Sequence, residues 1–128
     1  MKTIIALFFI SITLAVAQDA KALDEVIRKR DALLVEILDA KKQSLLAGGS
    51  LEAWHTATVN LYVFRRDAAK TPADRISWQE KIVAFEKKEA ADMRTREKAG
   101  VAQAMDVTIA EERALAAEQK LLELQLAK

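Results

Sequence analysis

Few residues in this sequence could carry catalysis or bind a metal ion. The chain of 128 residues has one histidine, His55, and no cysteine. A metal site would therefore depend on carboxylates, and the adjacent pairs Asp24–Glu25 and Glu111–Glu112 diverge by roughly 100° around a helix, so neither pair forms a chelate by itself. The sequence contains no glycine-rich phosphate loop and no nucleophile elbow. It predicts a protein that is not an enzyme and uses no cofactor.

The charge balance argues against two common classes of partner. The chain has 20 Lys plus Arg residues and 19 Asp plus Glu residues, for a net charge of +1. Without a basic excess, the sequence does not predict binding to nucleic acid or to an anionic membrane surface. No feature of it points to a small-molecule substrate. Three glycines and one proline among many Ala, Leu, Glu and Lys residues favour long helices, so we expect an all-α protein.

The first 17 residues have the features of a signal peptide. Lys2 supplies a positive start, and the segment 4–16 is apolar except for Ser11 and Thr13. Ala-Val-Ala at positions 15–17 forms a small-residue cleavage site ahead of Gln18. The alternative is an uncleaved membrane anchor, but an apolar run of about 13 residues is shorter than the roughly 20 that a spanning helix needs. We therefore predict an exported protein whose folded domain covers residues 18–128.

Turn signals divide this domain into two helical hairpins, at about 19–69 and 72–127. Gly48, Gly49 and Ser50 can end one helix and begin the next, and Gly100 can end a third. Pro72 fits the first position of a helix, where its missing N–H costs nothing. The predicted helices run from about Asp19 to Leu46, Leu51 to Ala69, Pro72 to Lys98, and Ala104 to Ala127.

The spacing of apolar residues predicts that these helices pack lengthwise on one another. Steps of three and four residues are typical of the contact line of a coiled coil. The same spacing occurs twice, with a shift of 53 residues, which indicates a long-period repeat of helix, glycine turn and helix. The first series is Trp54, Ala57, Leu61, Phe64 and Ala68, and the second is Val107, Ala110, Ala114, Ala117, Leu121 and Leu124.

The second glycine turn resembles that of a known family. Arg96, Gly100, Asp106, Val107 and Ala110 match, in order, a pattern close to R-Y-x-x-G-x-x-x-x-x-D-V-x-x-A. This pattern marks the periplasmic tip of the helical hairpins in TolC-like outer-membrane efflux proteins. An aromatic residue usually follows the arginine in the family, and this chain has a glutamate there. No segments of alternating apolar and polar residues predict the membrane strands of such a channel, so the chain cannot form the pore by itself.

The resemblance implies a coiled-coil protein of the bacterial envelope, in the periplasm or associated with the outer envelope. It would act through helix-mediated contacts in or beside a transport assembly. Its partner would be a protein, and helix packing also allows self-association. The alternative is a periplasmic coiled-coil chaperone or scaffold. The candidate contact residues lie at the two tips. The alternative is that Gly100 only ends one helix and Asp106 only caps the next. These candidates are Gly48, Gly49, Gly100, Asp106 and Val107.

Overall fold

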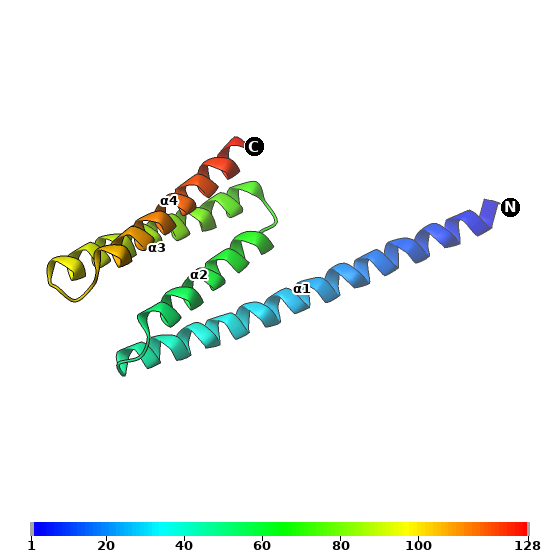
Figure 1. The fold of residues 1–128 in the computed structure, drawn as a ribbon. Helices are drawn as coiled ribbons and strands as arrows, with labels where there is room; N and C mark the ends of the chain where they lie inside the picture. Colours follow the sequence, from blue (N-terminus) through cyan, green and yellow to red (C-terminus); the bar gives the residue numbers. More distant parts are fainter. Residues whose placement is uncertain (1, 128) are drawn as a thin grey trace.

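The protein is entirely helical over the part of the chain that can be described. The computed structural model describes the backbone of residues 2–127 and the side chains of residues 16–127, and this part contains no strand. The predicted all-α class and the four predicted helices are confirmed, with most helix ends within one residue of expectation (Figure 1). The helices are α1 (Lys2–Leu46), α2 (Leu51–Ala68), α3 (Pro72–Lys98) and α4 (Ala104–Leu126).

The start of the first helix differs from the prediction. α1 begins at Lys2 rather than at about Asp19, so Asp19 lies inside the helix. The reason is local, because residues 2–22 contain neither glycine nor proline and nothing interrupts the helix. The predicted signal peptide includes side chains outside the described residues, and its cleavage stays a prediction. Within the described residues, no helix has an apolar stretch that could cross a membrane.

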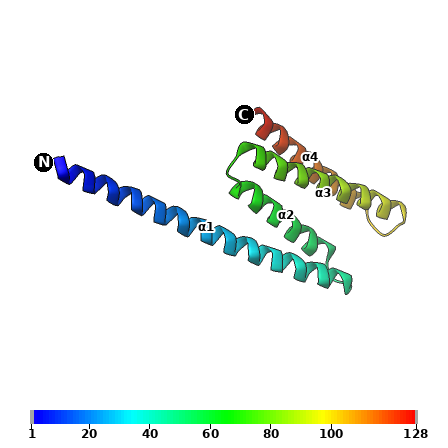
Figure 2. The same ribbon diagram turned by 180° about the vertical axis from the view of Figure 1, so that it is seen from behind.

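The helices pack in chain order rather than as a closed bundle. α1 packs on α2, α2 also packs on α3, and α3 packs on α4. Each connection is short, so consecutive helices run antiparallel and form the two predicted hairpins, with α2 and α3 joining them (Figures 1 and 2). The N-terminal part of α1 extends well beyond the other three helices.

Residues at the turns explain where the helices end. Gly48 and Gly100 have φ angles of +88° and +76°, which side chains other than glycine rarely adopt. The Ser50 hydroxyl accepts a hydrogen bond from the N–H of Ala53 at 3.1 Å, which caps α2. Thr71 caps α3 in the same way, and Pro72 occupies the first helical position. The predicted role of Ser50 and the predicted place of Pro72 are confirmed.

The core lies among α2, α3 and α4. Its centre is formed by Ile82, Val83 and Ala117, against which Tyr62 and Val63 pack. The predicted contact line of α4 is buried from its first turn to its middle, and its alanines let α3 approach closely. By contrast, no described residue of α1 is buried. The buried apolar residues of α4 are Val107, Ala110, Ala114 and Ala117.

Candidate functional site at the turn end

Both glycine turns lie at one end of the molecule, and the turn at Thr71 and Pro72 lies at the other end (Figures 1 and 2). The two turns are staggered. His55 of α2 contacts Glu86 of α3, with four residues of α2 before His55 and twelve residues of α3 after Glu86. At 1.5 Å per residue, this difference makes the turn between α3 and α4 project about 12 Å beyond the start of α2. The stagger leaves a step in the surface, lined by Leu51 of α2, by Glu89, Met93 and Arg96 of α3, and by Val101 of the second turn. We call this surface the turn-end step.

The three glycines predicted as tip contacts each have a structural role. Gly48 and Gly100 provide the left-handed conformation that ends α1 and α3. Gly49 lies against the preceding helix, where an added Cβ atom would come within 2.6 Å of the Ser44 carbonyl oxygen. All three glycines are therefore required by the turns themselves, two for their conformation and Gly49 for lack of space, whether or not a partner binds there.

Asp106 and Val107 are also used by the fold. Gln103 is the N-cap of α4, and its backbone N–H donates to Oδ2 of Asp106 at 2.8 Å. Asp106 therefore stabilises the start of α4 from the third helical position. Val107 is 8% exposed, which leaves little of its side chain available to a partner. Of the two roles that the sequence allowed for Asp106, capping is the one that the geometry supports.

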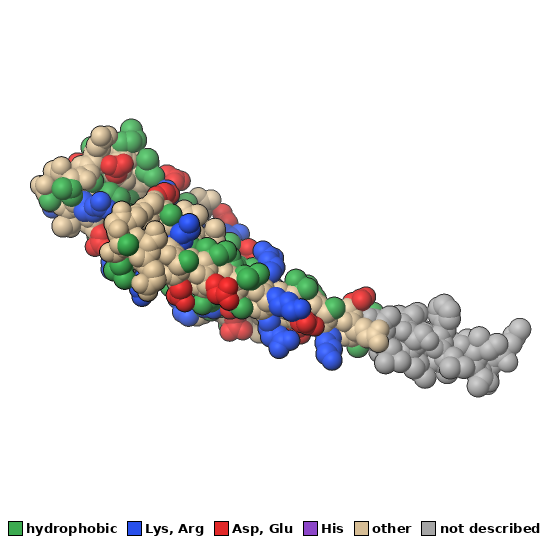
Figure 3. All heavy atoms as spheres, turned by 90° about the horizontal axis from the view of Figure 1, so that it is seen from below, with side chains coloured by type: hydrophobic (Ala, Val, Ile, Leu, Met, Phe, Trp, Pro, Cys, Tyr) green, Lys and Arg blue, Asp and Glu red, His purple; other side chains and the backbone are tan. Residues whose placement is uncertain are grey.

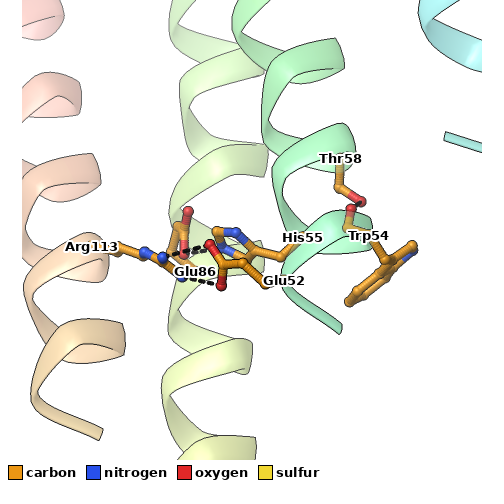
Figure 4. Close-up of polar contacts among 6 residues, drawn as sticks. All are labelled: Glu52, Trp54, His55, Thr58, Glu86 and Arg113. Atoms are coloured by element: carbon orange, nitrogen blue, oxygen red, sulfur yellow. Dashed lines mark hydrogen bonds and ion pairs between the residues drawn. The ribbon is translucent and has the colours of Figure 1, made fainter. Parts of the chain in front are cut away.

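Polar contacts tie three helices together at the turn-end step (Figure 4). The Arg113 guanidinium of α4 donates two hydrogen bonds to the Glu52 carboxylate of α2, at 2.8 and 3.3 Å. Beneath this pair, Nε2 of His55 lies 2.9 Å from Oε2 of Glu86, and both residues are buried. The ring of Phe85 stacks on the His55 ring at 5.4 Å between centroids. These contacts fix the position of α2 against the α3–α4 hairpin.

The lone histidine has no nucleophile aligned with it. The Thr58 hydroxyl, one turn further along α2, donates instead to the Trp54 carbonyl oxygen at 2.9 Å. Figure 4 shows Thr58 directed toward Trp54 and away from His55. Within the described residues, no group of three or more metal-binding side chains comes together. The local chemistry is that of a buried imidazole–carboxylate contact between two helices.

A row of three α3 side chains lines the step, at Glu89, Met93 and Arg96. On one side of the row is a groove of about 240 Å³ that reaches the start of α4. On the other side is a groove of about 220 Å³ that reaches Trp54, and both grooves also include Leu51. The spacing of four and three residues places the row on one face of α3. The row thus places one acidic, one apolar and one basic side chain next to each other on the step.

The Glu89 carboxylate is the unusual group in this row. Its pKa is raised from the ordinary value of 4.5, chiefly because partial burial disfavours the charged form, while the charges of Lys88 and His55 act in the opposite direction. Among the side chains that the structure describes, none forms a hydrogen bond or an ion pair with it. The Glu89 carboxylate is thus partly shielded from water, and it lines an open groove.

Sequence reasoning did not single out this row. The segment EKKEAADMRTREK, which contains it, is typical of a solvated helix face or of a partner-binding face. Lys88 and Asp92 do form an exposed ion pair, and Arg94 pairs with Glu111 of α4. Glu89 faces the step instead. Glu89 lies four residues before Met93 and seven before Arg96, and this spacing places the three residues on one face of a helix. The sequence does not show that this face lies beside α2, because that depends on how the helices pack. Comparisons with protein-family models, with curated proteins and with solved structures find no match for this chain.

Proposed function

We propose that this chain is a non-enzymatic, exported protein that binds a protein partner by helix packing at the turn-end step. The observation that carries the proposal is the Glu89 carboxylate, which is partly buried, has a raised pKa and faces the groove with no hydrogen-bond or ion-pair partner among the described side chains. A carboxylate held away from water costs free energy unless a cation or a hydrogen-bond donor meets it. Titratable groups whose pKa is shifted by burial in a cleft occur often at functional sites.

The surroundings of Glu89 suit a protein partner. Met93 and Leu51 offer apolar contact on either side of the carboxylate, and Arg96 adds a positive charge at the end of the row. Val101, in the projecting turn, lines the same groove and is 66% exposed. An apolar centre with charged residues around it is the usual composition of a protein interface. We expect the partner to place a basic side chain beside Glu89.

A location in the envelope follows from the predicted signal peptide, and a role in or beside a transport assembly follows from the TolC-like resemblance. Both are proposals. The chaperone alternative has a separate observation in its favour, because α4 also exposes apolar side chains next to the step. Met105 is 62% exposed and Ile109 is 45% exposed. A surface of this kind could hold an unfolded client, whereas a transport assembly would supply one defined partner.

Site-specific photocrosslinking in intact envelopes tests the proposal. A photoreactive side chain in place of Met93 should capture a protein, whereas the same side chain at Ala73, near the opposite end, should not. Glu89→Gln keeps the shape of the side chain and removes the charge, so it should reduce capture. Glu112→Gln, at an exposed position of α4, is the matched control and should capture as the parent does.

The pattern of captured proteins separates the two candidate functions. One band of defined size indicates a specific assembly, and a spread of products indicates client binding. Equal capture by the Glu89→Gln and Glu112→Gln variants would contradict a contact at Glu89. Capture from Ala73 but not from Met93 would place the interface at the other end of the molecule.

A further inference from the structure

One face of α1 is apolar, and no other described helix packs on it. Leu23, Val26, Leu33 and Ile37 are between 47% and 60% exposed. Together with Arg30 they follow steps of three, four, three and four residues, the spacing of a helix-packing line. This line, which we call the open face, lies about a quarter turn around α1 from the side chains that meet α2. Figure 3 views the molecule from below and shows apolar side chains between charged ones along its surface.

Arg30 does not block the open face. Its guanidinium lies over the Phe64 ring of α2, 4.7 Å from the ring centroid, so its charge is directed toward α2. The aliphatic stem is the part that remains on the open face. Beside it, a groove of about 560 Å³ between α1 and α2 continues the apolar surface through Leu23, Leu34 and Phe64. A helix laid on the open face would also contact the rim of this groove.

We propose that a second copy of this chain covers the open face, with the two α1 helices packed antiparallel. The evidence is the charge pattern on the edge of the face that points away from α2, where Lys29 and Glu36 lie one heptad apart. Within α1, Lys29 forms an exposed ion pair with Glu25 at 2.9 Å, which it can exchange for a contact across the interface. When Val26 of one copy opposes Ile37 of the other, each Lys29 lies beside Glu36 of the second copy. The contact is self-complementary, as a two-fold symmetric interface requires.

Other alignments of the two helices bring like charges together. A shift of one heptad in one direction places Glu36 against Glu36, and a shift in the other direction places Lys29 against Lys29. Like charges at such positions weaken an interface, so among antiparallel alignments the pattern selects one register. Because the open face is short, we expect a dissociation constant in about the micromolar range.

Disulfide crosslinking tests the register directly, because the natural chain has no cysteine. Val26→Cys and Ile37→Cys variants are purified after expression of the full chain, and each is oxidised alone and mixed with the other. The antiparallel register predicts covalent dimers in the mixture and few from either variant alone, because only the mixed pair brings the two sulfurs within bonding range. Efficient dimers from Val26→Cys alone would overturn the proposal in favour of a parallel pair.

Charge exchange tests the basis of recognition. Sedimentation of the parent should show a monomer–dimer equilibrium, and Lys29→Glu should weaken the dimer about tenfold by creating two repulsive contacts. Adding Glu36→Lys to the same chain should restore the parent affinity. Circular dichroism checks that each variant keeps its helix content. A parent that stays monomeric at concentrations up to about 1 mM, or a double variant that remains as weak as Lys29→Glu, would overturn the proposal.

Discussion

The burial of polar side chains in α3 could not be predicted from the sequence. The buried residues of α3 include Ile76, Gln79, Val83, Glu86 and Ala90, again in steps of three and four residues. Two of the five are polar, and Gln79 is only 1% exposed. Because two members of this line are polar, the apolar pattern of α3 is interrupted. By hydrophobicity alone, the helix is predicted to be exposed to solvent after Phe85. The partners that make burial tolerable come from α2 and α4, far away in the sequence.

Gln79 is the first of these residues to test. Its Nε2 donates to the Ala117 carbonyl oxygen at 2.9 Å, and its Oε1 accepts from Arg66 at 2.7 Å. We expect Gln79→Leu to lower the free energy of unfolding by about 1–3 kcal/mol, because the buried partners lose their hydrogen bonds. Urea denaturation measures the change. Gln119→Leu, at an exposed position, is the control and should stay within about 0.5 kcal/mol of the parent.

Glu89 predicts a specific dependence of stability on pH. Because its pKa is raised in the folded state, folding binds a proton between the ordinary value of 4.5 and the folded value. Its contribution therefore favours the folded state at low pH and is lost as the pH rises through the folded pKa. Glu89→Gln should be more stable than the parent at neutral pH, and the difference should disappear below about pH 4.5. Thermal melts across this range measure it, and a variant less stable at neutral pH would contradict it.

At the scale of elements, the sequence was informative because local chemistry determines helix ends. The glycines, Ser50 and the Thr71–Pro72 pair act within a few residues of themselves, so the turns and helix limits could be predicted. The predicted start of α1 was wrong, because no glycine or proline interrupts the helix before Asp19. The alanine-rich contact line of α4 was also predictable, since its periodicity needs only one helix.

Ala114 tests whether that line carries stability. It is 7% exposed and lies between α3 and α4. We expect Ala114→Glu to destabilise the protein by about 2–4 kcal/mol, because a carboxylate would be forced into a packed interface. Ala116→Glu, at an exposed position of the same helix, should change the melting temperature little. Equal melting of both variants would show that α3 and α4 do not pack through Ala114.

The attachment of α1 to α2 includes one ion pair that responds to acid. The Arg65 guanidinium donates two hydrogen bonds to the Asp31 carboxylate, at 2.6 and 2.9 Å. These bonds, opposed by desolvation and aided by charge attraction, lower the pKa of Asp31 from its ordinary value of 3.8. The stabilisation is therefore present above about pH 4 and is lost as the pH falls through the lower, folded value.

Replacing Asp31 should expose this contribution. Because both side chains are about one-third exposed, Asp31→Asn should cost no more than about 1 kcal/mol at neutral pH. The cost should shrink on acidification below the folded pKa, where the parent also loses the charge. Denaturation curves at several pH values give the difference. A cost that stays constant down to the lowest pH would assign the effect to packing rather than to charge.

At the scale of the whole molecule, the alternation of helix direction could be predicted, and it correctly places both glycine turns at one end. The stagger between them could not, because it depends on how far α2 slides along α3. That register is determined by contacts such as His55 with Glu86 and Glu52 with Arg113, which no local pattern contains. The turn-end step and its Glu89 carboxylate therefore emerged only from the assembled helices.

The order of packing also determines how the protein should open. Because α1 packs on α2 alone among the described helices, it is an end unit that can detach while α2, α3 and α4 stay folded. α1 also has no buried residue among those described. Amide hydrogens of α1 should exchange with deuterium faster than those at the centre of α3, through openings that leave α3 and α4 paired. In the dimer proposed above, this exchange should slow as the protein concentration rises.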